Sequence, residues 1–390
     1  MSRNIITGID IGTYNIKVIV AEHEKDDKKL PSIIGVGFSE SRGLRYGYII
    51  NTSDVMASLK KAIEQAERTS KVKIKKAYVS MGGISLDSVV SSGSTIISRG
   101  DNEITETDIE KAVESSENNI PQQEMVNKKV IHTIPLSYKI DGKTVLGRPL
   151  GMKGIKFEVN TLFVTCLEQH MQDLVQAIEE TGIEVEEIIA APVAASLIAI
   201  SRAQKIAGVV LANIGSETVS IIIYDNNIPI SVKVFPIGST DITHDIALGL
   251  KIPLEEAEKI KLGAITRTDY SKKKLDEIIV ARLTDIFEII DSHLKKIHRN
   301  GLLPAGIVIT GGGSGISTIE DLAKATLKLP SKIAQVRYPG DSKIQIKDSS
   351  WSVAYGLCVL GLTNEGESIG IRLAKNTKNS FMSWIKQFYP

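Results

Sequence analysis

The sequence predicts an α/β protein built from two related lobes, and three observations lead to this fold class. The first is an internal repeat, because residues 5–20 (IITGIDIGTYNIKVIV) and 209–224 (VVLANIGSETVSIIIY) each place a glycine turn between two β-branched runs. Such runs are typical of paired β-strands. The second is the length, since 390 residues exceed one ordinary hydrophobic core. The third is the alternation of strand and helix periods along the rest of the chain.

The first lobe begins with the earlier repeat and continues into a strand over 32–38. Residues 54–70 carry apolar side chains at a helical period with lysines and glutamates opposite, which predicts a surface helix that covers a sheet. A further strand, KKAYVSMGG, follows at 75–83. The segment therefore predicts a small sheet with one covering helix.

Residues 85–162 predict an inserted α/β module. Thr105 is expected to cap a helix that ends near Asn119, with Asp108 reaching back to the cap. The pair Asp141-Gly142 lies between two strand patterns and predicts a tight hairpin. His132 stands alone between apolar residues and is interpreted as a satisfied structural group. Because no catalytic cluster occurs here, we expect this module to serve interactions rather than chemistry.

The second half repeats the strand and helix alternation around the later turn. Pro192 is expected in the first turn of the helix that precedes this turn. A glycine run then follows a short strand at 306–310. The predicted elements are helices at 168–181, 192–203, 243–249, 254–262 and 275–299, a strand at 185–190, a helix beginning near Ser317, and a last helix at 352–361.

Composition excludes several classes of function. Lysine and arginine total 47 against 46 acidic residues, so the net charge of +1 creates no field that would attract nucleic acid, and we expect no nucleic-acid partner. Cys166 and Cys358 lie far apart within apolar runs and are expected to be reduced core residues. No secretory signal and no apolar run near the ~20 residues of a membrane span is found, so we expect an intracellular protein.

The two repeated turns have the chemistry of a phosphate clamp. A glycine at the apex lets backbone N–H groups face a phosphate, and nearby hydroxyls add donors without bulk. The turns differ in one group, because the first has a carboxylate where the second has an amide. The aligned pairs are Asp10 with Asn213, Gly12 with Gly215, Thr13 with Ser216, and Asn15 with Thr218.

Five pieces occur in a fixed order: DIGT with Lys17, a helix opened by Ala-Pro, NIGSET, the Ala-Glu-x-Ile-Lys helix at 257–261, and TGGG before a final helix. This order resembles the actin-like ATPase superfamily, and within it the FtsA family of bacterial cell-division proteins over nearly the whole chain. The resemblance implies an actin-like two-lobe fold of duplicated ribonuclease H-like domains, with the FtsA-type inserted subdomain and a C-terminal amphipathic helix.

The same resemblance implies a division of the chain into subdomains. We expect 1–84 and 163–195 to form subdomain IA, 85–162 the inserted subdomain IC, 196–238 and 303–350 subdomain IIA, and 239–302 subdomain IIB. Residues 351–372 are expected to return to IA, followed by a linker at 373–378 and a membrane-targeting helix at 379–390.

The resemblance further implies that the protein binds ATP and Mg²⁺. Asp10 is expected to hold the metal through water. Gly12, Thr13, Tyr14, Asn15 and Lys17 are expected to face the β and γ phosphates, and Asn213, Gly215, Ser216, Glu217 and Thr218 to close from the other lobe. Glu258 and Lys261 match a ribose-contacting pair, and Gly311, Gly312 and Gly313 match an adenosine turn. The alternative for Glu258 and Lys261 is an ordinary surface pair one helical turn apart. The alternative for the three glycines is a tight turn that binds nothing.

Two departures bear on catalysis. Ala191 stands where the superfamily usually has an acidic or amide residue, and Asn213 stands where it usually has Asp. Hydrolysis needs a group that orients the attacking water, and losing one commonly costs about two to four orders of magnitude in rate. Glu217 replaces a glycine of the usual turn, and a carboxylate beside the γ phosphate is repulsive unless magnesium lies between them. We therefore expect ATP binding with very slow or no hydrolysis, and no confident catalytic residue.

The end of the chain has the pattern of a membrane-binding helix. Over 379–390 the apolar side chains recur at spacings of three, four and seven, with Lys386 on the opposite face. Docking of this helix on the protein's own surface is the alternative, and a polar stretch before it favours the membrane. The apolar residues are Phe381, Trp384, Ile385 and Phe388.

The resemblance implies filaments of self-associated copies at the cytoplasmic face of the inner membrane, at the division site. The implied partners are the tubulin-like protein FtsZ, the anionic membrane surface, and other division proteins through the inserted subdomain. The nearest alternative is the FtsA-like platform adaptor of type IV pili (PilM-like), which the C-terminal helix disfavours. A sugar or acetate kinase would need a carboxylate base, and none is evident beyond Asp10.

Overall fold

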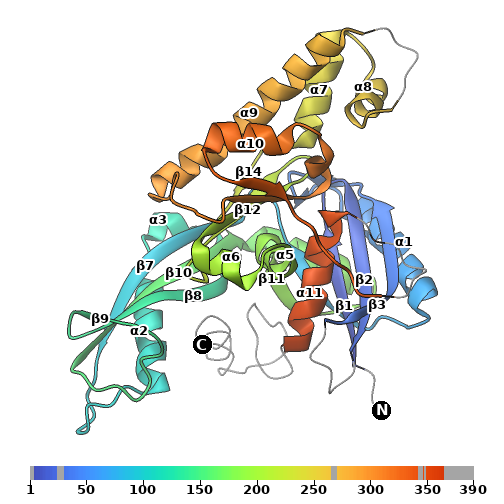
Figure 1. Ribbon diagram of the computed structural model, residues 1–390. Helices are drawn as coiled ribbons and strands as arrows, with labels where there is room; N and C mark the ends of the chain where they lie inside the picture. Colours follow the sequence, from blue (N-terminus) through green and yellow to red (C-terminus); the bar gives the residue numbers. More distant parts are fainter. Residues whose placement is uncertain (1–3, 24–29, 265–269, 341–345, 347, 364–390) are drawn as a thin grey trace.

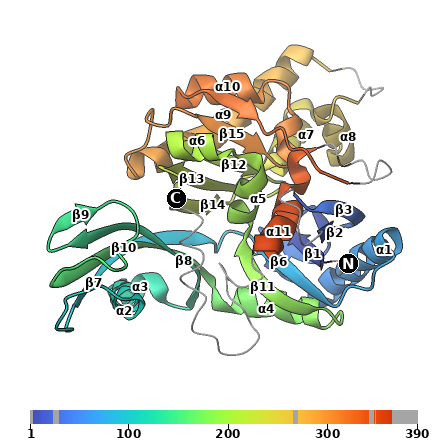
Figure 2. The same ribbon diagram turned by 60° about the horizontal axis from the view of Figure 1, so that its bottom comes forward.

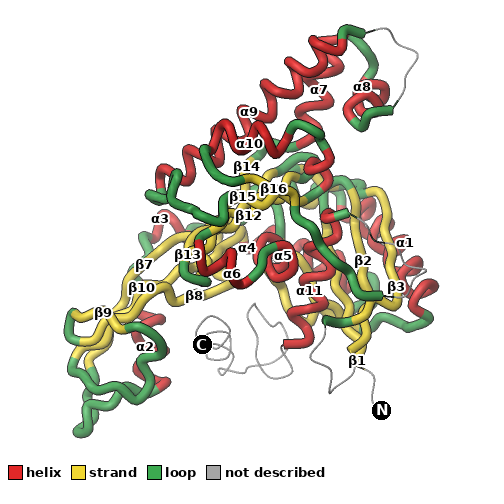
Figure 3. Tube along the Cα trace, viewed as in Figure 1, coloured by secondary structure: helices red, strands yellow, loops and turns green. Residues whose placement is uncertain are grey.

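The computed structural model describes residues 4–23, 30–264, 270–340, 346 and 348–363, and Figure 1 shows two lobes with a third module beside them. Three larger β-sheets carry the fold, as the strands of Figure 3 show. The predicted C-terminal helix at 379–390 lies outside the described residues. No helix within the described ranges is long and apolar enough to cross a membrane.

Lobe 1 is built on a five-stranded sheet of order β11-β6-β1-β2-β3. Strands β1, β2 and β3 are antiparallel neighbours, whereas β6 lies parallel to β1 and β11 parallel to β6. A two-stranded ribbon of β4 (Leu44–Arg45) and β5 (Tyr48–Ile49) follows β3. The sheet strands are β1 (Asn4–Ile11), β2 (Asn15–His23), β3 (Ser32–Glu40), β6 (Lys76–Met81) and β11 (Glu184–Ala190).

Lobe 2 repeats this topology strand for strand, with the order β14-β13-β12-β15-β16. Its first three strands are again antiparallel and its last two again parallel. The predicted repeat is confirmed and extends beyond the hairpins to a whole sheet. The strands are β12 (Val209–Ile214), β13 (Val219–Asp225), β14 (Ile228–Phe235), β15 (Ile307–Thr310) and β16 (Ser331–Ile333).

Helices cover both faces of the lobe 1 sheet. Gly8 pairs with Ile19, and a Cβ at Gly8 would lie 2.3 Å from the Ala354 carbonyl of α11 (Ser352–Thr363). Gly37 pairs with Val18, and its Cβ would lie 1.9 Å from a carbonyl of α1 (Thr52–Ser70). Because successive residues of a strand face opposite sides, α11 and α1 lie on opposite faces. Helix α4 (Glu168–Glu179) contacts α1.

The lobes are joined where α11 packs along α5 (Ala191–Ala199), as Figures 1 and 2 both show. A Cβ at Gly356 would lie 2.0 Å from the Ala194 carbonyl, so the two helices need this glycine to approach so closely. Lobe 2 has its own apolar core beneath helices that Figure 1 shows above its sheet. These are α7 (Ser239–Leu250), α8 (Leu254–Lys261), α9 (Lys272–Lys296) and α10 (Ile319–Leu327).

The inserted module has a four-stranded sheet and a separate apolar core. Thr105 and Asp108 form the predicted capping box of α2 (Glu106–Asn118), with the Thr105 N–H 2.9 Å from the carboxylate. Asp141 and Gly142 form the predicted two-residue hairpin and both have positive φ, 49° and 78°. The other elements are β7 (Asp87–Ile96), α3 (Gln122–Met125), β8 (Lys128–Ile140), β9 (Lys143–Val145) and β10 (Lys156–Leu167).

Two predicted helices need correction. The helix expected over 192–203 is two helices, because Ile200 is extended (φ −127°, ψ 128°) and Ser201 caps a new helix, α6 (Arg202–Ala207), together with Gln204. The helix expected over 243–249 begins at Ser239, because the Asp241 carboxylate accepts a hydrogen bond from the N–H of residue 238 at 2.8 Å. The other predicted helices of the described chain agree within a few residues, and α3 (Gln122–Met125) was not predicted.

Both cysteines are buried and free, as predicted. Burial raises the pKa of the Cys166 thiol to about 12 and also raises that of Cys358. The thiols therefore stay protonated and behave as small apolar core groups.

Candidate nucleotide-binding site

The two repeated turns close with the same hydrogen bond. The Gly12 N–H donates to the Asn15 carbonyl at 3.2 Å, and the Gly215 N–H donates to the Thr218 carbonyl at 2.9 Å. A Cβ at either glycine would lie 2.9 Å from the carbonyl oxygen that its own N–H contacts, that of Asn15 or of Thr218. A glycine is therefore required at both positions by close approach of the backbone.

The turns meet at the boundary between the lobes, where the Thr13 and Ser216 hydroxyls lie 2.7 Å apart. Among the described residues, the backbone N–H groups of Thr13, Tyr14, Ser216 and Glu217 make no hydrogen bond. Adjacent N–H groups without protein partners are what an anion such as phosphate requires. The expected juxtaposition of the two turns is thus present, and its donors are available.

Asp10 is the second-last residue of β1, beside the first turn. The Ser80 hydroxyl of β6 donates to its Oδ1 at 2.8 Å. Burial raises the pKa of the Asp10 carboxyl, while the Lys17 charge and the Ser80 hydrogen bond oppose the rise. No group of three metal-ligating side chains occurs in the described part of the chain. A lone carboxylate suits Mg²⁺, which keeps most of its water and takes few protein ligands.

Lys17 lies opposite Asp10 in the β1–β2 ladder. Its Nζ donates to the Ser350 carbonyl at 2.7 Å and to the Ser350 hydroxyl at 2.6 Å, and it lies 5.4 Å from the Trp351 ring centroid. Burial lowers the pKa of the Lys17 ammonium, and Asp10 and Asp348 oppose this. Lys17 therefore also fixes the 3₁₀ turn η2 (Ser349–Trp351) from which α11 begins.

The second turn rests on the start of α7. The N–H groups of Ser239 and Thr240 donate to the carbonyls of Gly215 and Ser216 at 2.9 and 2.8 Å. A Cβ at Gly238 would lie 2.2 Å from the Ser216 carbonyl oxygen. The turn is therefore held rigidly to α7.

Glu258 and Lys261 form an ion pair of 2.6 Å on α8. The Lys261 side chain is 7% exposed, and its Nζ also donates to the Thr243 hydroxyl at 2.8 Å and to the Ser239 carbonyl at 3.2 Å. The Thr243 hydroxyl in turn donates to Glu258 at 2.5 Å. The pair is bonded to α7, the helix that supports the second turn, and its contact with a ribose stays a prediction.

The glycine run packs against the second turn. Gly311 has φ +93°, and a Cβ there would lie 2.3 Å from the Asn213 Oδ1. A Cβ at Gly313 would lie 2.6 Å from the Ile214 side chain, whereas one at Gly312 would have nothing within 4 Å. Two glycines are thus required by packing, and Gly312 presents open backbone at the start of η1 (Gly312–Gly315).

The two positions that depart from the superfamily lie on different lobes. Ala191 is the buried first residue of α5, whereas Asn213 is in β12 beside Gly311. The buried His132 Nε2 accepts the Ala190 N–H at 2.9 Å, which agrees with its predicted structural role. Sequence reasoning missed Ser80, Ser350 and Thr243, which support the site from distant elements and carry no motif of their own.

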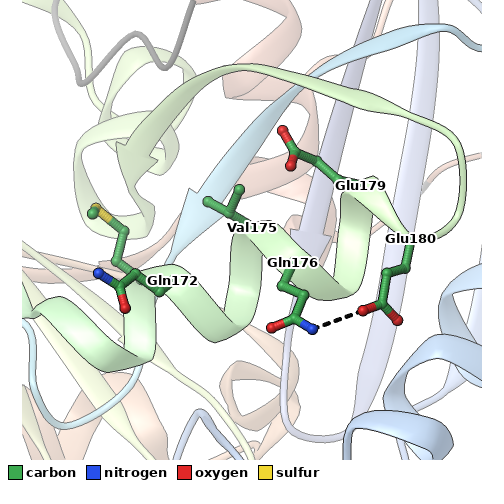
Figure 4. Close-up of a pocket in the computed structure, with 6 residues that line it drawn as sticks. Gln172, Val175, Gln176, Glu179 and Glu180 are labelled. Atoms are coloured by element: carbon green, nitrogen blue, oxygen red, sulfur yellow. Dashed lines mark hydrogen bonds between the residues drawn. The ribbon is translucent and has the colours of Figure 1, made fainter.

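A shallow groove of about 440 Å³ lies elsewhere, along α4 (Figure 4). Gln176 donates to Glu180 at 2.7 Å across one turn of this helix. The described side chains that line it all come from α4 and none comes from the turns. The lining residues are Met171, Gln172, Val175, Gln176, Glu179 and Glu180.

Known structures share this fold. The PilM–PilN type IV pilus biogenesis complex aligns with a TM-score of 0.68 and 17% identity, covering 92% of this chain and 98% of that one. MreB5 of Spiroplasma citri bound to ADP aligns with a TM-score of 0.51 and 14% identity, covering 90% and 94%. The expected actin-like two-lobe fold is therefore confirmed.

Sequence comparison identifies the family. Residues 210–356 match the family described as cell division protein FtsA, and 83–165 match the SHS2 domain inserted in FtsA. The FtsA of Borreliella burgdorferi is 31% identical over 90% of both chains. That of Pseudomonas aeruginosa is 27% identical over 97% of this chain and 94% of its own, and that of Bacillus subtilis 28% over 95% and 87%. This chain belongs to the FtsA family of cell division proteins.

Proposed function

We propose that this chain binds ATP between its lobes, assembles into filaments on the inner membrane, and attaches FtsZ to that membrane at the division site. The observation that carries the nucleotide part is the meeting of two glycine turns at the lobe boundary, with backbone N–H groups that have no partner within the described chain. Membership of a cell-division family supports the cellular role.

The residues present fit a magnesium nucleotide. Asp10 is a single carboxylate beside the turns, suited to an ion held through water, and Lys17 places a positive charge next to it. The N–H groups of both turns would bind the phosphates, Glu258 and Lys261 the ribose, and the open Gly312 the adenine ring. MreB5 of Spiroplasma citri, which shares the fold, has been solved with ADP and with AMPPNP.

Hydrolysis is proposed to be very slow. Bound magnesium would neutralise phosphate charge, but transfer to water also needs a side chain that orients the water. Ala191 has no polar group, and the Asn213 amide cannot accept a proton. Nucleotide binding would then act mainly by holding the lobes together.

Attachment to the membrane is proposed to depend on residues 379–390. Each apolar side chain that enters the membrane contributes ~1.5–3 kcal/mol, and each nearby cation about 1 kcal/mol, so one such helix anchors only marginally. Many copies in a filament would bind stably through effective concentration. The inserted subdomain is proposed to contact other division proteins.

Electron microscopy on anionic lipid monolayers, with and without ATP, tests this function when phosphate release is measured in parallel. Filaments on the lipid with little phosphate release are the expected result. A truncated chain ending at residue 378 should form no filaments on lipid and should not pellet with anionic liposomes. Pelleting of that chain with liposomes would show that the anchor lies elsewhere.

The second candidate function is that of a pilus adaptor, because the PilM–PilN complex aligns with this chain at a TM-score of 0.68. At 17% identity this likeness concerns the fold alone. Co-sedimentation with FtsZ filaments distinguishes the two, since a pilus adaptor has no reason to bind them.

A further inference from the structure

Glu217 lies in the second turn and reaches across the lobe boundary. Its carboxylate accepts a hydrogen bond from the backbone N–H of Tyr46, which belongs to the β4–β5 ribbon of lobe 1. This contact and the Thr13–Ser216 hydroxyl pair join the same turn directly to lobe 1. The turn proposed to hold the outer phosphate is therefore already bonded to the opposite lobe by protein atoms.

Both ends of this contact are rigid. The second turn is held to α7 by the Ser239 and Thr240 N–H groups. On the other side, a Cβ at Gly47 would lie 2.3 Å from the Gly83 Cα, and the Tyr46 carbonyl accepts the Ile84 N–H at 3.1 Å. The hydrogen bond therefore fixes the spacing of the lobes rather than the position of a loose loop.

If the second turn faces the outermost phosphate as proposed, the charge of Glu217 lies in the same turn. A carboxylate in the turn repels the outermost phosphate of a triphosphate more than it repels a diphosphate, because the extra phosphate adds negative charge nearby. Backbone strain does not explain this residue, since Glu217 is not among the described residues with positive φ. In that arrangement the carboxylate would lower the affinity for the terminal phosphate, while its hydrogen bond to Tyr46 joins the lobes without a nucleotide.

We propose that Glu217 is a positioning and specificity residue that closes the lobes on a nucleoside diphosphate as well as on a triphosphate, so that closure does not depend on the terminal phosphate. This inference rests on the proposed nucleotide site. It predicts that the chain binds ADP and ATP about equally and assembles with either.

The test uses the full chain with MgADP and MgATP, measuring both affinities by calorimetry, lobe closure by small-angle scattering, and filaments on lipid monolayers. Glu217→Ala removes the acceptor and the charge. The affinity for ATP should therefore rise about tenfold relative to that for ADP, and the closed, assembled state should require ATP. Glu217→Gln keeps an acceptor, the amide oxygen, without the charge. The affinity for ATP relative to ADP should therefore rise, while the lobes still close with ADP. Asp87→Asn is the matched control, because its 2.6 Å ion pair with Lys233 joins β7 of the inserted module to β14 of lobe 2 outside the site.

The control should leave the ratio of ADP to ATP affinities unchanged. An unchanged ratio in Glu217→Ala, with both nucleotides still bound and the chain folded by circular dichroism, would overturn the inference while leaving the nucleotide site standing. A wild-type chain that assembles only with ATP would overturn it as well. Absence of any nucleotide binding by the wild type would overturn the proposed function, and this inference with it.

Discussion

Gly312 offers a direct test of the adenosine turn, because it differs from its neighbour Gly311 in what surrounds it. A Cβ at Gly312 meets no atom within 4 Å, so Gly312→Ala should fold normally and change the free energy of unfolding little. An adenine ring packed on that backbone would be displaced by the added methyl. A ring of about ten atoms that loses ~0.1–0.2 kcal/mol at each loses ~1–2 kcal/mol, or roughly tenfold in affinity.

The assay is displacement of a fluorescent adenine nucleotide, with thermal unfolding of each variant measured alongside. Gly315→Ala is the matched control, since Gly315 lies in the same 3₁₀ turn and its Cβ also has nothing within 4 Å. Gly311→Ala should instead destabilise the fold, because its φ is +93° and its Cβ would lie 2.3 Å from Asn213. Wild-type affinity in a folded Gly312→Ala variant would refute the adenosine assignment.

Three further predictions concern buried groups and catalysis. Burial lowers the pKa of Lys205 to about 8, below its unfolded value, so its charged form destabilises the fold fully below about pH 8 and not at all above about pH 10.5. The Lys205 Nζ lies 4.7 Å from the centroid of the Tyr224 ring, a cation–π contact that offsets part of this cost. Lys205→Met should therefore raise the urea-unfolding free energy by ~1–2 kcal/mol at pH 7 and by little at pH 10.5. His132→Leu leaves the buried Ala190 N–H without its acceptor and should lower that free energy by ~1–3 kcal/mol, whereas His132→Gln should lower it less. Ala191→Gln with Asn213→Asp should raise phosphate release about tenfold or more, and an unchanged rate despite normal ATP binding would mean that other groups limit hydrolysis.

Local signals predicted most of the fold. The repeated turns and the Asp141-Gly142 hairpin were readable because each turn type needs its own residues at fixed places. The break between α5 and α6 was missed, because the residues around Ile200 suit a helix, whereas in the structure Ile200 is extended and the Ser201–Gln204 capping box begins α6. Helix propensity alone does not place the break there, and the capping box sets where α6 begins.

The candidate site residues could be named from the sequence, but the contacts between them could not. The bond from Glu217 to Tyr46 joins residues 171 positions apart, and that from Lys17 to Ser350 joins residues 333 apart. Such contacts depend on how the two lobes, and the segment that leads into α11, are placed in space. Periodic sequence patterns do not encode that placement. The sequence likewise does not show that Lys261 is buried against α7, where its Nζ donates to the Ser239 carbonyl.

The supports of the site differ between the lobes, and this bears on what a nucleotide does. In lobe 2, the second turn and the Glu258–Lys261 pair both rest on α7, so a ligand that contacts either one acts on the same helix. In lobe 1, Asp10 rests on β6 and Lys17 on η2. A ligand across the boundary would thus join one rigid unit to two separate supports, and its binding free energy would go into the relative position of the lobes. On the proposed function, with no water-orienting group at residues 191 and 213, bound nucleotide would act by holding the lobes in one relative position.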